Sequence, residues 1–438
     1  MNDHAAHEMR AAARDIFLHA LAETTIAKAF DRHINYSRGV LRICEDLYDL
    51  GVYNRVFVLA LGKAAHSMLE ALAAQIGPGL SGIVAAPVDP AAQLPNFRYY
   101  RGGHPLPNAE SLRAAEATLK ALRALTQKSL ALYLISGGGS AVLEKPVDPD
   151  IPLEDVIATY KALVHCGAPI AEINAIRKHL SAVKGGRMTT AAPLAQHISI
   201  MVSDVPDNAL DSLASGPTLP DSTTVEHCYA IAERYKLLPM LPESVRELFE
   251  RHALDETPKK DDPAFIQSRW WTVLSSSTAQ TDAAAAAAMH GFAVEVDNSC
   301  DDQDYKQAAD HLLKKVRKLR EGVSRVCLIS GGEVTVQVGG DAGVGGRNQQ
   351  FALYCAEKIA GENITVLSAG TDGIDGNSTA AGAVADGTTL PRAQAAGQDP
   401  GKALARFDAF PLFEALGDAV VTGPTGNNVR DLRILLAY

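Results

Sequence analysis

The glycine-rich turn Ser136-Gly-Gly-Gly-Ser140 is one of the segments of this sequence best suited to chemistry. It follows the apolar run 131–135, and its free backbone amides can point at an anion such as a phosphate or a carboxylate. The alternative is a tight turn that binds nothing. We expect the turn to bind substrate or nucleotide through Ser136, Gly137, Gly138, Gly139 and Ser140.

Two cations stand at comparable places. Lys63 follows the apolar run Arg55–Leu61 directly after Gly62, where an ammonium can reach a transferring phosphoryl group, although a lysine there can also be merely solvated. Arg347 ends a glycine-dense segment just before a predicted helix, Gln349–Ala360. Because cations are disfavoured at a helix N-terminus, an arginine there is easier to understand if it clamps a phosphate or carboxylate.

Standard nucleotide fingerprints are not met. Phe57 occupies the first glycine position of a Walker A loop and Ala64 its Ser/Thr position, while Val142 replaces the third glycine of a dinucleotide motif. No GxSxG nucleophile elbow accompanies these segments. Classical dehydrogenase and hydrolase functions are therefore disfavoured.

A basic cluster interrupts an otherwise acidic chain. It places five cationic side chains within eleven positions, namely Arg177, Lys178, His179, Lys184 and Arg187. A surface that binds carboxylate or phosphate is one interpretation, with Arg177 and Lys184 as the expected ligands, and an ordinary solvated helix face is the other.

Oxygen-rich turns follow two further apolar runs. Asp204 is well placed for a hard cation such as Mg²⁺, although an Asx-type turn selects the same residues. Asp372, after the run 364–367, offers a second carboxylate for metal or hydroxyl binding. We expect the remaining contacts to substrate or nucleotide from Asp207, Asn208, Asp375 and Thr425.

Composition limits the class of protein. The 438 residues carry 41 Lys and Arg against 51 Asp and Glu, a net charge of -10, which argues against a nucleic-acid or anionic-membrane partner. There is no signal peptide and no apolar run long enough to span a membrane, so we expect a cytoplasmic protein. The six cysteines are scattered, without metal-ligand spacing. Whether the chain forms a homo-oligomer stays open.

Short apolar runs ending in small or polar residues must position these groups. Strands are predicted at 55–61, 131–135, 198–202, 271–274, 326–329 and 364–367, and a last apolar run covers 432–437. Helical patterns separate most of them, which predicts βαβ units and an open α/β sheet. The first sixty residues indicate helices at Ala11–Phe30 and Tyr36–Leu50. The charged, proline-containing stretch 254–268 predicts a boundary between domains 1–255 and 269–438.

Taken together, these segments resemble one family. The motifs are Gly102–Pro107, Ser136–Ser140, Ile173–Ser181 with Lys184–Gly186, Ser203–Val205, Ala214–Pro217, Gly345–Gln349, Thr371–Gly376 and Pro424–Gly426. They occur in the order typical of the class II glycerate 2-kinases, whose C-terminal domain is called MOFRL. Asn427 and Arg430 depart from the terminal pattern, where similar proteins usually carry Thr and Asn.

The resemblance implies ATP-dependent phosphorylation of D-glycerate, a small molecule, to 2-phosphoglycerate, with Mg²⁺. It also implies a larger N-terminal Rossmann-like domain, a smaller C-terminal α/β domain and an active site in the cleft between them. The family's catalytic lysine and arginine fall on Lys63 and Arg347. Asp204 and Asp372 are candidates for holding Mg²⁺ or for orienting the attacking hydroxyl.

Two other functions stay open at this level. Proteins similar to this family have been called hydroxypyruvate reductases, so an NAD(P)H-dependent oxidoreductase is the first alternative, and the missing dinucleotide fingerprint counts against it. A non-catalytic sensor of a small hydroxy acid is the second, and it would not need both Lys63 and Arg347.

Overall fold

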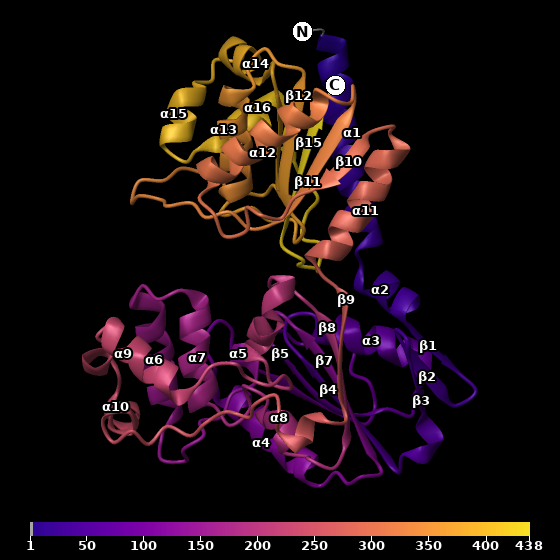
Figure 1. Cartoon of the computed structure of the whole chain (residues 1–438), viewed down its shortest axis with the longest axis vertical. Coiled ribbons are helices and arrows are strands. Elements are labelled where there is room, and N and C mark those ends of the chain that lie inside the picture. Colours follow the sequence, from indigo (N-terminus) through magenta and orange to yellow (C-terminus); the bar gives the residue numbers. More distant parts are fainter. Residues whose placement is uncertain (1–2) are drawn as a thin grey trace. The chain divides into compact units, whose positions relative to one another are not determined.

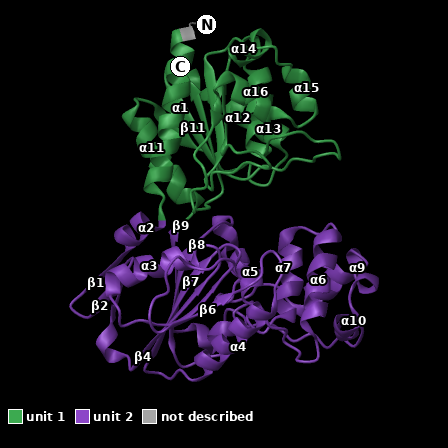
Figure 2. Cartoon of the chain, turned by 180° about the vertical axis from the view of Figure 1, so that it is seen from behind, with its two compact units in different colours: residues 1–25, 274–438 green, residues 26–273 purple. Residues whose placement is uncertain are grey.

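The structure is a computed structural model that describes residues 3–438, and it divides into two compact units (Figure 2). Unit 1 comprises residues 3–25 and 274–438, and unit 2 comprises residues 26–273. Each unit contains its own six-stranded sheet flanked by helices. The predicted α/β class with a two-domain layout is confirmed.

The sheet of unit 2 has the strand order β6-β5-β4-β7-β8-β9, and adjacent strands from β6 to β8 are parallel. The chain runs outward from β4 through β5 and β6, then returns to add β7 and β8 on the other side of β4. The direction of winding therefore reverses between β4 and β7, which is where open α/β sheets bind ligands. The strands are β4 (Arg55–Leu61), β5 (Ser81–Ala86), β6 (Phe97–Arg101), β7 (Ser129–Ser136), β8 (Gln196–Val202) and β9 (Ser268–Leu274).

Helices connect these strands and form a side lobe. Most of the apolar run of β4 is buried, as expected for a strand covered on both faces. Figure 1 shows α6, α7, α9 and α10 grouped beside the sheet of unit 2, and their apolar faces share one core that includes Leu163, Ile176 and Phe249. The helices are α2 (Ile26–His33), α3 (Ala65–Ile76), α4 (Ala109–Arg123), α5 (Gly139–Val142), α6 (Leu153–His165), α7 (Ile170–Leu180), α8 (Arg187–Thr190), α9 (Val225–Arg234) and α10 (Glu243–Glu250).

The helix predicted over Tyr36–Leu50 is wrong. The segment forms a three-stranded antiparallel sheet of β1 (Ile34–Ser37), β2 (Val40–Ile43) and β3 (Asp46–Asp49). Its turns contain Arg38, Gly39 and Cys44 with positive φ, a conformation that ends a helix. A short apolar run is compatible with the periodicity of a helix or of a strand. Here the turn residues with positive φ favour strands.

The sheet of unit 1 is mixed, with the order β10-β11-β15-β12-β13-β14. The final strand β15 lies between β11 and β12 and is antiparallel to both. This differs from the parallel sheet that the alternation of strands and helices predicts, because the end of the chain returns into the middle of the sheet. The strands are β10 (Ala293–Val296), β11 (Val326–Gly332), β12 (Ile364–Gly370), β13 (Gly382–Asp386), β14 (Ala419–Val420) and β15 (Asp431–Ala437).

The N-terminal helix α1 (Asp3–Glu23) packs on this second sheet, although it was predicted to belong to the N-terminal domain. Its residues Ile16, Phe17 and Ala20 are buried in one core with Leu367 of β12 and Ile434 of β15. In Figure 1 the indigo helix lies beside α11 and the strands of the C-terminal half. The other helices of unit 1 are α11 (Ser276–Met289), α12 (Tyr305–Arg320), α13 (Arg347–Lys358), α14 (Thr389–Ala395), α15 (Pro400–Ala405) and α16 (Ala409–Leu416).

The stretch 254–268, expected between domains 1–255 and 269–438, is held against unit 2. The Thr257 hydroxyl donates to Asp221 at 2.9 Å, and the Arg187 guanidinium donates to the Asp255 carbonyl at 3.2 Å. The chain passes into unit 1 only at Leu274. These hydrogen bonds explain why a polar, proline-containing segment does not form a free linker.

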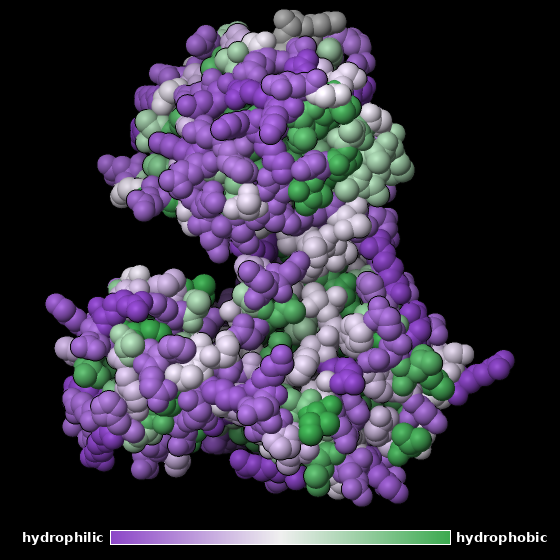
Figure 3. All heavy atoms as spheres, in the orientation of Figure 1, coloured by the Kyte–Doolittle hydropathy of each residue, from purple (hydrophilic) through white to green (hydrophobic). Residues whose placement is uncertain are grey.

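The surface of unit 1 varies in polarity. Figure 3 shows a hydrophilic surface over α12 and α15 and a more apolar one over α11, which contains the alanine run 283–288. No helix of residues 3–438 combines the length and the apolar character that crossing a membrane needs.

The placement of α1 can be tested with Phe17, which is fully buried, and its neighbour Leu18, which is 47% exposed. Phe17→Ala removes a core ring and leaves a cavity, so we expect a loss of about 3–5 kcal/mol in the free energy of unfolding, measured in urea. Leu18→Ala, the matched control, should cost less than about 0.5 kcal/mol. Hydrogen exchange in Phe17→Ala should increase in β12 and β15. An increase confined to β4 and β7 would contradict the assignment of α1 to unit 1.

Candidate active site

The loops that follow β4 and β7 form the first part of the site. The Lys63 N–H donates to the Gly137 carbonyl at 2.8 Å, and the Ala64 N–H donates to the Ser136 hydroxyl at 3.0 Å. Ser136 in turn donates to the Leu61 carbonyl at 3.2 Å. The two predicted segments therefore lie together at the point where the winding of the sheet reverses.

Glycine is required for this close approach. Gly62 has φ of +106°, and a Cβ added there would lie 2.4 Å from the Ser136 carbonyl oxygen. Gly138 has φ of +79°, and a Cβ on it would lie 3.0 Å from Cγ of Lys63. The absence of side chains at these positions lets the aliphatic part of Lys63 lie across the turn.

Lys63 is exposed, and no hydrogen bond or ion pair of its ammonium occurs within residues 3–438. Beside it lies His104, whose Cε1 would be 3.4 Å from a Cβ added to Gly138. Burial lowers the pKa of the His104 imidazole, and the Lys63 charge lowers it further. The sequence analysis noted the motif around His104 but gave this residue no role.

Asp204 also contacts the turn. A Cβ added to Gly137 would lie 1.8 Å from Oδ2 of Asp204, so the carboxylate rests directly against the Gly137 backbone. Asp207 and Asn208 lie at the start of a 3-10 helix (Asp207–Ser215) and are exposed. Of these three expected ligands, Asp204 is the one that the structure places against the turn.

Two residues that were not expected in the site, Ser215 and Asn174, complete the surroundings of Ser140. The hydroxyl groups of Ser140 and Ser215 are 2.8 Å apart, and Ser215 donates to the Asn174 side chain at 3.4 Å. Ala214, Ser215 and Gly216 all have positive φ, a strained run for the two non-glycine residues. The left-handed turn and the polar residue on α7 become recognisable as one feature only once α7 packs against the 3-10 helix Asp207–Ser215.

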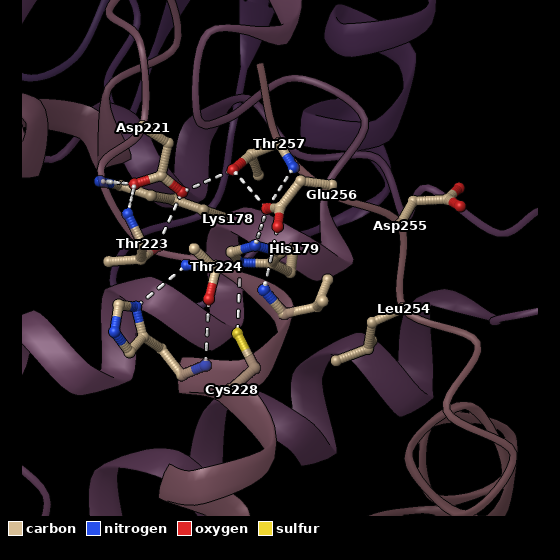
Figure 4. Close-up of polar contacts among 12 residues, drawn as sticks. Lys178, His179, Asp221, Thr223, Thr224, Cys228, Leu254, Asp255, Glu256 and Thr257 are labelled. Carbon is tan, nitrogen blue, oxygen red and sulfur yellow. Dashed lines mark hydrogen bonds and ion pairs between the residues drawn. The ribbon is translucent and has the colours of Figure 1, made fainter. Parts of the chain in front are cut away.

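The basic cluster on and after α7 is not a free anion-binding surface. Lys178 is buried and donates to Asp211 at 2.7 Å and to Asp221 at 3.1 Å. His179 is fully buried, with Nε2 2.9 Å from Glu256 and Nδ1 2.8 Å from the Ala175 carbonyl. Figure 4 shows Lys178 beside Asp221 and His179 beside Glu256, with Thr257 next to both carboxylates.

Lys184 and Arg177, the two expected ligands of this cluster, also face into unit 2. Lys184 is 1% exposed and forms an ion pair with Glu144, which also accepts from Tyr160 and Ser181. Burial lowers the pKa of Lys184, and Glu144 opposes this. The Arg177 guanidinium carbon lies 4.3 Å from the centre of the Tyr160 ring. Lys184 is thus buried with its charge balanced by Glu144, and its role is to stabilise the fold.

Arg347 is the first residue of α13 in unit 1, and two carboxylates hold it. Its guanidinium donates to Asp431 at 2.6 and 3.1 Å and forms an ion pair with Glu333 at 2.8 Å. Burial would lower the pKa of Arg347, but the bonds with Asp431 and Glu333 raise it above its ordinary value. The register of β15 brings Asp431 opposite Gly332 and Gly370, which explains how residues so distant in sequence meet.

The N-terminus of α13 is satisfied internally by Asp375. This carboxylate accepts the N–H groups of Asn348 and Gln349 at 3.0 and 2.9 Å. Burial raises the pKa of Asp375 to about 6, although these bonds oppose the shift. Asp375, expected to bind substrate or nucleotide, is thus 2% exposed and caps a helix, so the dipole of α13 is compensated within unit 1.

A cavity of about 760 Å³ lies next to Arg347 within unit 1. Its wall includes Asp372 and Glu333 together with the apolar side chains of Val338 and Ile374. Thr425 lies close by, since its N–H donates to the Asp372 carbonyl at 3.0 Å. Asp372 itself accepts the Ile374 N–H at 3.1 Å. A cavity of this size accommodates a drug-sized ligand.

The two positions that depart from the family pattern have defined contacts in unit 1. The Arg430 guanidinium donates to Asp301 at 2.7 Å, and the Asn427 side chain donates to the Thr24 carbonyl. Nowhere in residues 3–438 do three or more His, Cys, Asp or Glu side chains gather as a group that could hold a metal ion.

The fold and these loops define a class of two-unit α/β proteins with a cationic, glycine-rich site at a sheet switch point. Two family models match the chain: a domain of unknown function, DUF4147, over residues 12–250 and the MOFRL family over residues 326–431. The D-glycerate 2-kinase of Thermotoga maritima is 35% identical over 87% of this chain and 90% of its own length. A putative hydroxypyruvate reductase of Agrobacterium vitis is 36% identical over 87% of both chains.

Solved structures agree with this relationship. The glycerate kinase of Thermotoga maritima superposes with a TM-score of 0.85 at 31% identity, covering 99% of this chain and 100% of that one. A Pyrococcus horikoshii protein superposes with a TM-score of 0.84 at 31% identity, covering 98% of both chains. The chain belongs to the glycerate 2-kinase family with a MOFRL domain, as the sequence motifs indicated.

The structural role of Lys184 leads to a stability prediction. Lys184→Met leaves the Glu144 carboxylate buried without its cation, so we expect a loss of about 3–5 kcal/mol in the free energy of unfolding. The matched control is Lys145→Met, because Lys145 pairs with Glu116 at an exposed site and should cost at most about 1 kcal/mol. Urea unfolding measures both. If both variants lose equally little stability and Lys184→Met loses substrate affinity, Lys184 binds a ligand instead.

Proposed function

We propose that this protein transfers the terminal phosphoryl group of ATP to D-glycerate, giving 2-phosphoglycerate and ADP. The observation that carries the proposal is Lys63, an exposed cation without an anionic partner in the described chain, beside the amides of Ser136–Ser140 at the switch point. Membership of the glycerate kinase family supports the same reaction.

In this proposal Lys63 and Arg347 neutralise charge on the phosphoryl oxygens, because phosphoryl transfer is accelerated mainly by positioning and electrostatics. The Ser136–Ser140 turn binds a substrate oxyanion through its amides, and the Ser140–Ser215–Asn174 hydrogen bonds hold the turn in place. Lys63 belongs to unit 2 and Arg347 to unit 1.

Mg²⁺ is proposed to accompany ATP. Magnesium sites in such enzymes use one or two carboxylates together with substrate phosphates and water, which fits a chain whose described residues hold no cluster of three ligands. Asp204, against the Gly137 backbone, and Asp372, on the cavity beside Arg347, are the carboxylates proposed to hold the ion or to orient the attacking hydroxyl. The bound ion would supply charge neutralisation.

A reductase is the second candidate, because relatives from Agrobacterium vitis carry the name putative hydroxypyruvate reductase. Val142 still stands at the third glycine position of the dinucleotide motif, and α5, which contains it, has only four residues. A dinucleotide site normally uses a full helix N-terminus after that glycine motif. The kinase is therefore the better supported reaction.

The proposal predicts that Lys63→Ala and Arg347→Ala each lower kcat by about 10³-fold or more. Each substitution removes a positive charge that neutralises the oxygens of the transferred phosphoryl group. ADP release and ³¹P NMR of the product measure this with D-glycerate, ATP and Mg²⁺. Lys128→Ala, an exposed lysine of the same unit as Lys63, should keep wild-type turnover. NADH oxidation with hydroxypyruvate, without any phosphorylated product, would replace the kinase by the reductase. Binding of glycerate without any turnover would instead indicate a sensor.

A further inference from the structure

The motif Gly102–Pro107 lies in the loop between β6 and α4 and has no role in the reaction as described so far. We propose that His104 of this loop is the general base that accepts the proton of the acceptor hydroxyl during phosphoryl transfer. The inference rests on the proposed kinase function and adds a catalytic residue to it.

The loop is built to hold His104 against the switch-point turn. The Gly103 N–H donates to the Ser111 hydroxyl at 2.9 Å, and the Asn108 side-chain amide donates to the Arg101 carbonyl at 3.2 Å. Gly102 packs so closely on α5 that an added Cβ would lie 2.3 Å from the Val142 carbonyl oxygen. The hydrogen bonds fix the loop on α4 and β6, and Gly102 packs on α5, the helix that continues the turn.

His104 and Lys63 flank one glycine. Both approach the position of a Gly138 Cβ, His104 with Cε1 at 3.4 Å and Lys63 with Cε at 3.3 Å. A substrate oxygen bound at the turn would thus meet a cation and an imidazole together. This arrangement suits a hydroxyl that must lose its proton as it attacks a phosphoryl group.

The hydrogen-bonding state of His104 distinguishes it from the structural histidines of unit 2. His197 is buried between the Tyr133 hydroxyl and the Ala192 carbonyl, and His179 between Ala175 and Glu256. His104 is exposed, and its ring makes no hydrogen bond with residues 3–438. Its nitrogens are therefore available to a ligand.

The charges around His104 favour its neutral form. Partial burial of the imidazole against the turn lowers its pKa, and the Lys63 ammonium lowers it further, while the Asp204 carboxylate lies against the preceding glycine of the turn, Gly137. With a pKa below its ordinary value of about 6.5, the ring is mostly neutral at pH 7 and can accept a proton.

The hydroxyl on C2 of glycerate forms the new O–P bond while its proton passes to an imidazole nitrogen of His104. The bond between the terminal phosphorus and the bridging oxygen of ATP breaks, and ADP leaves with the electron pair. The resulting imidazolium returns its proton to water before the next turnover.

The test is His104→Gln, which keeps polarity and approximate size but cannot act as a base. We expect kcat to fall by about 10²-fold or more, as general bases contribute about 10² to 10⁴, while KM for ATP changes less than about threefold. His165→Gln, an exposed histidine of α6, is the matched control and should retain wild-type kinetics. Thermal unfolding of each variant checks that the fold is intact.

A pH profile separates a base from a merely structural side chain. Wild-type kcat should fall as the pH drops below about 6.5, because protonation removes the base, and His104→Gln should lose that dependence. The terminal phosphate of ATP titrates in the same range, so the two profiles are compared at identical ATP and Mg²⁺ concentrations. Added imidazole should partly restore the activity of His104→Ala.

Three results would overturn the inference: turnover of His104→Gln within threefold of wild type, an unchanged acidic limb, or loss of activity at high pH that His104→Gln abolishes. The last result would show that the imidazolium binds an anion instead. Wild-type enzyme that does not phosphorylate glycerate would refute the proposed function itself, and active wild type with active His104→Gln would refute only the role of His104.

Discussion

The close approach of the β4 and β7 loops is the constraint on which the site in unit 2 depends. Their backbones are joined by the hydrogen bond from Lys63 to Gly137, and the gap between them leaves no room for a Cβ at Gly62. Because these strands are neighbours where the winding reverses, their carboxyl ends open to the same space. Lys63, the amides of the turn, Asp204 and His104 are therefore brought together by sheet topology and by glycine.

Charge compensation divides the cations of this protein into two groups. Lys178, Lys184 and Arg430 are buried and paired with carboxylates, and each pair avoids the cost of an isolated buried charge. Lys63 lacks such a partner within the described residues, so its charge stays available to a ligand. Arg347 lies between these cases: Asp431 and Glu333 fix its orientation, while it remains partly exposed on a large cavity.

The mixed sheet of unit 1 has a direct consequence for Arg347. Since β15 is inserted between β11 and β12 in the opposite direction, its first residue, Asp431, meets the carboxyl ends of both neighbours. A carboxylate from the end of the chain is thus delivered to the first turn of α13. This explains why an arginine is stable at a position where a helix dipole disfavours cations, without any bound anion.

The sequence by itself indicated the strands over 55–61, 131–135 and 364–367, the glycine turns after them, the family and the cations Lys63 and Arg347. These features depend on local patterns of apolar residues and glycine. Only the tertiary structure decided that 36–50 is a sheet, that α1 packs with unit 1 and that Lys184 and Asp375 are internal. It alone brought His104, Ser215 and Asn174 to the turn. These features depend on partners distant in the chain, whose positions no local pattern specifies.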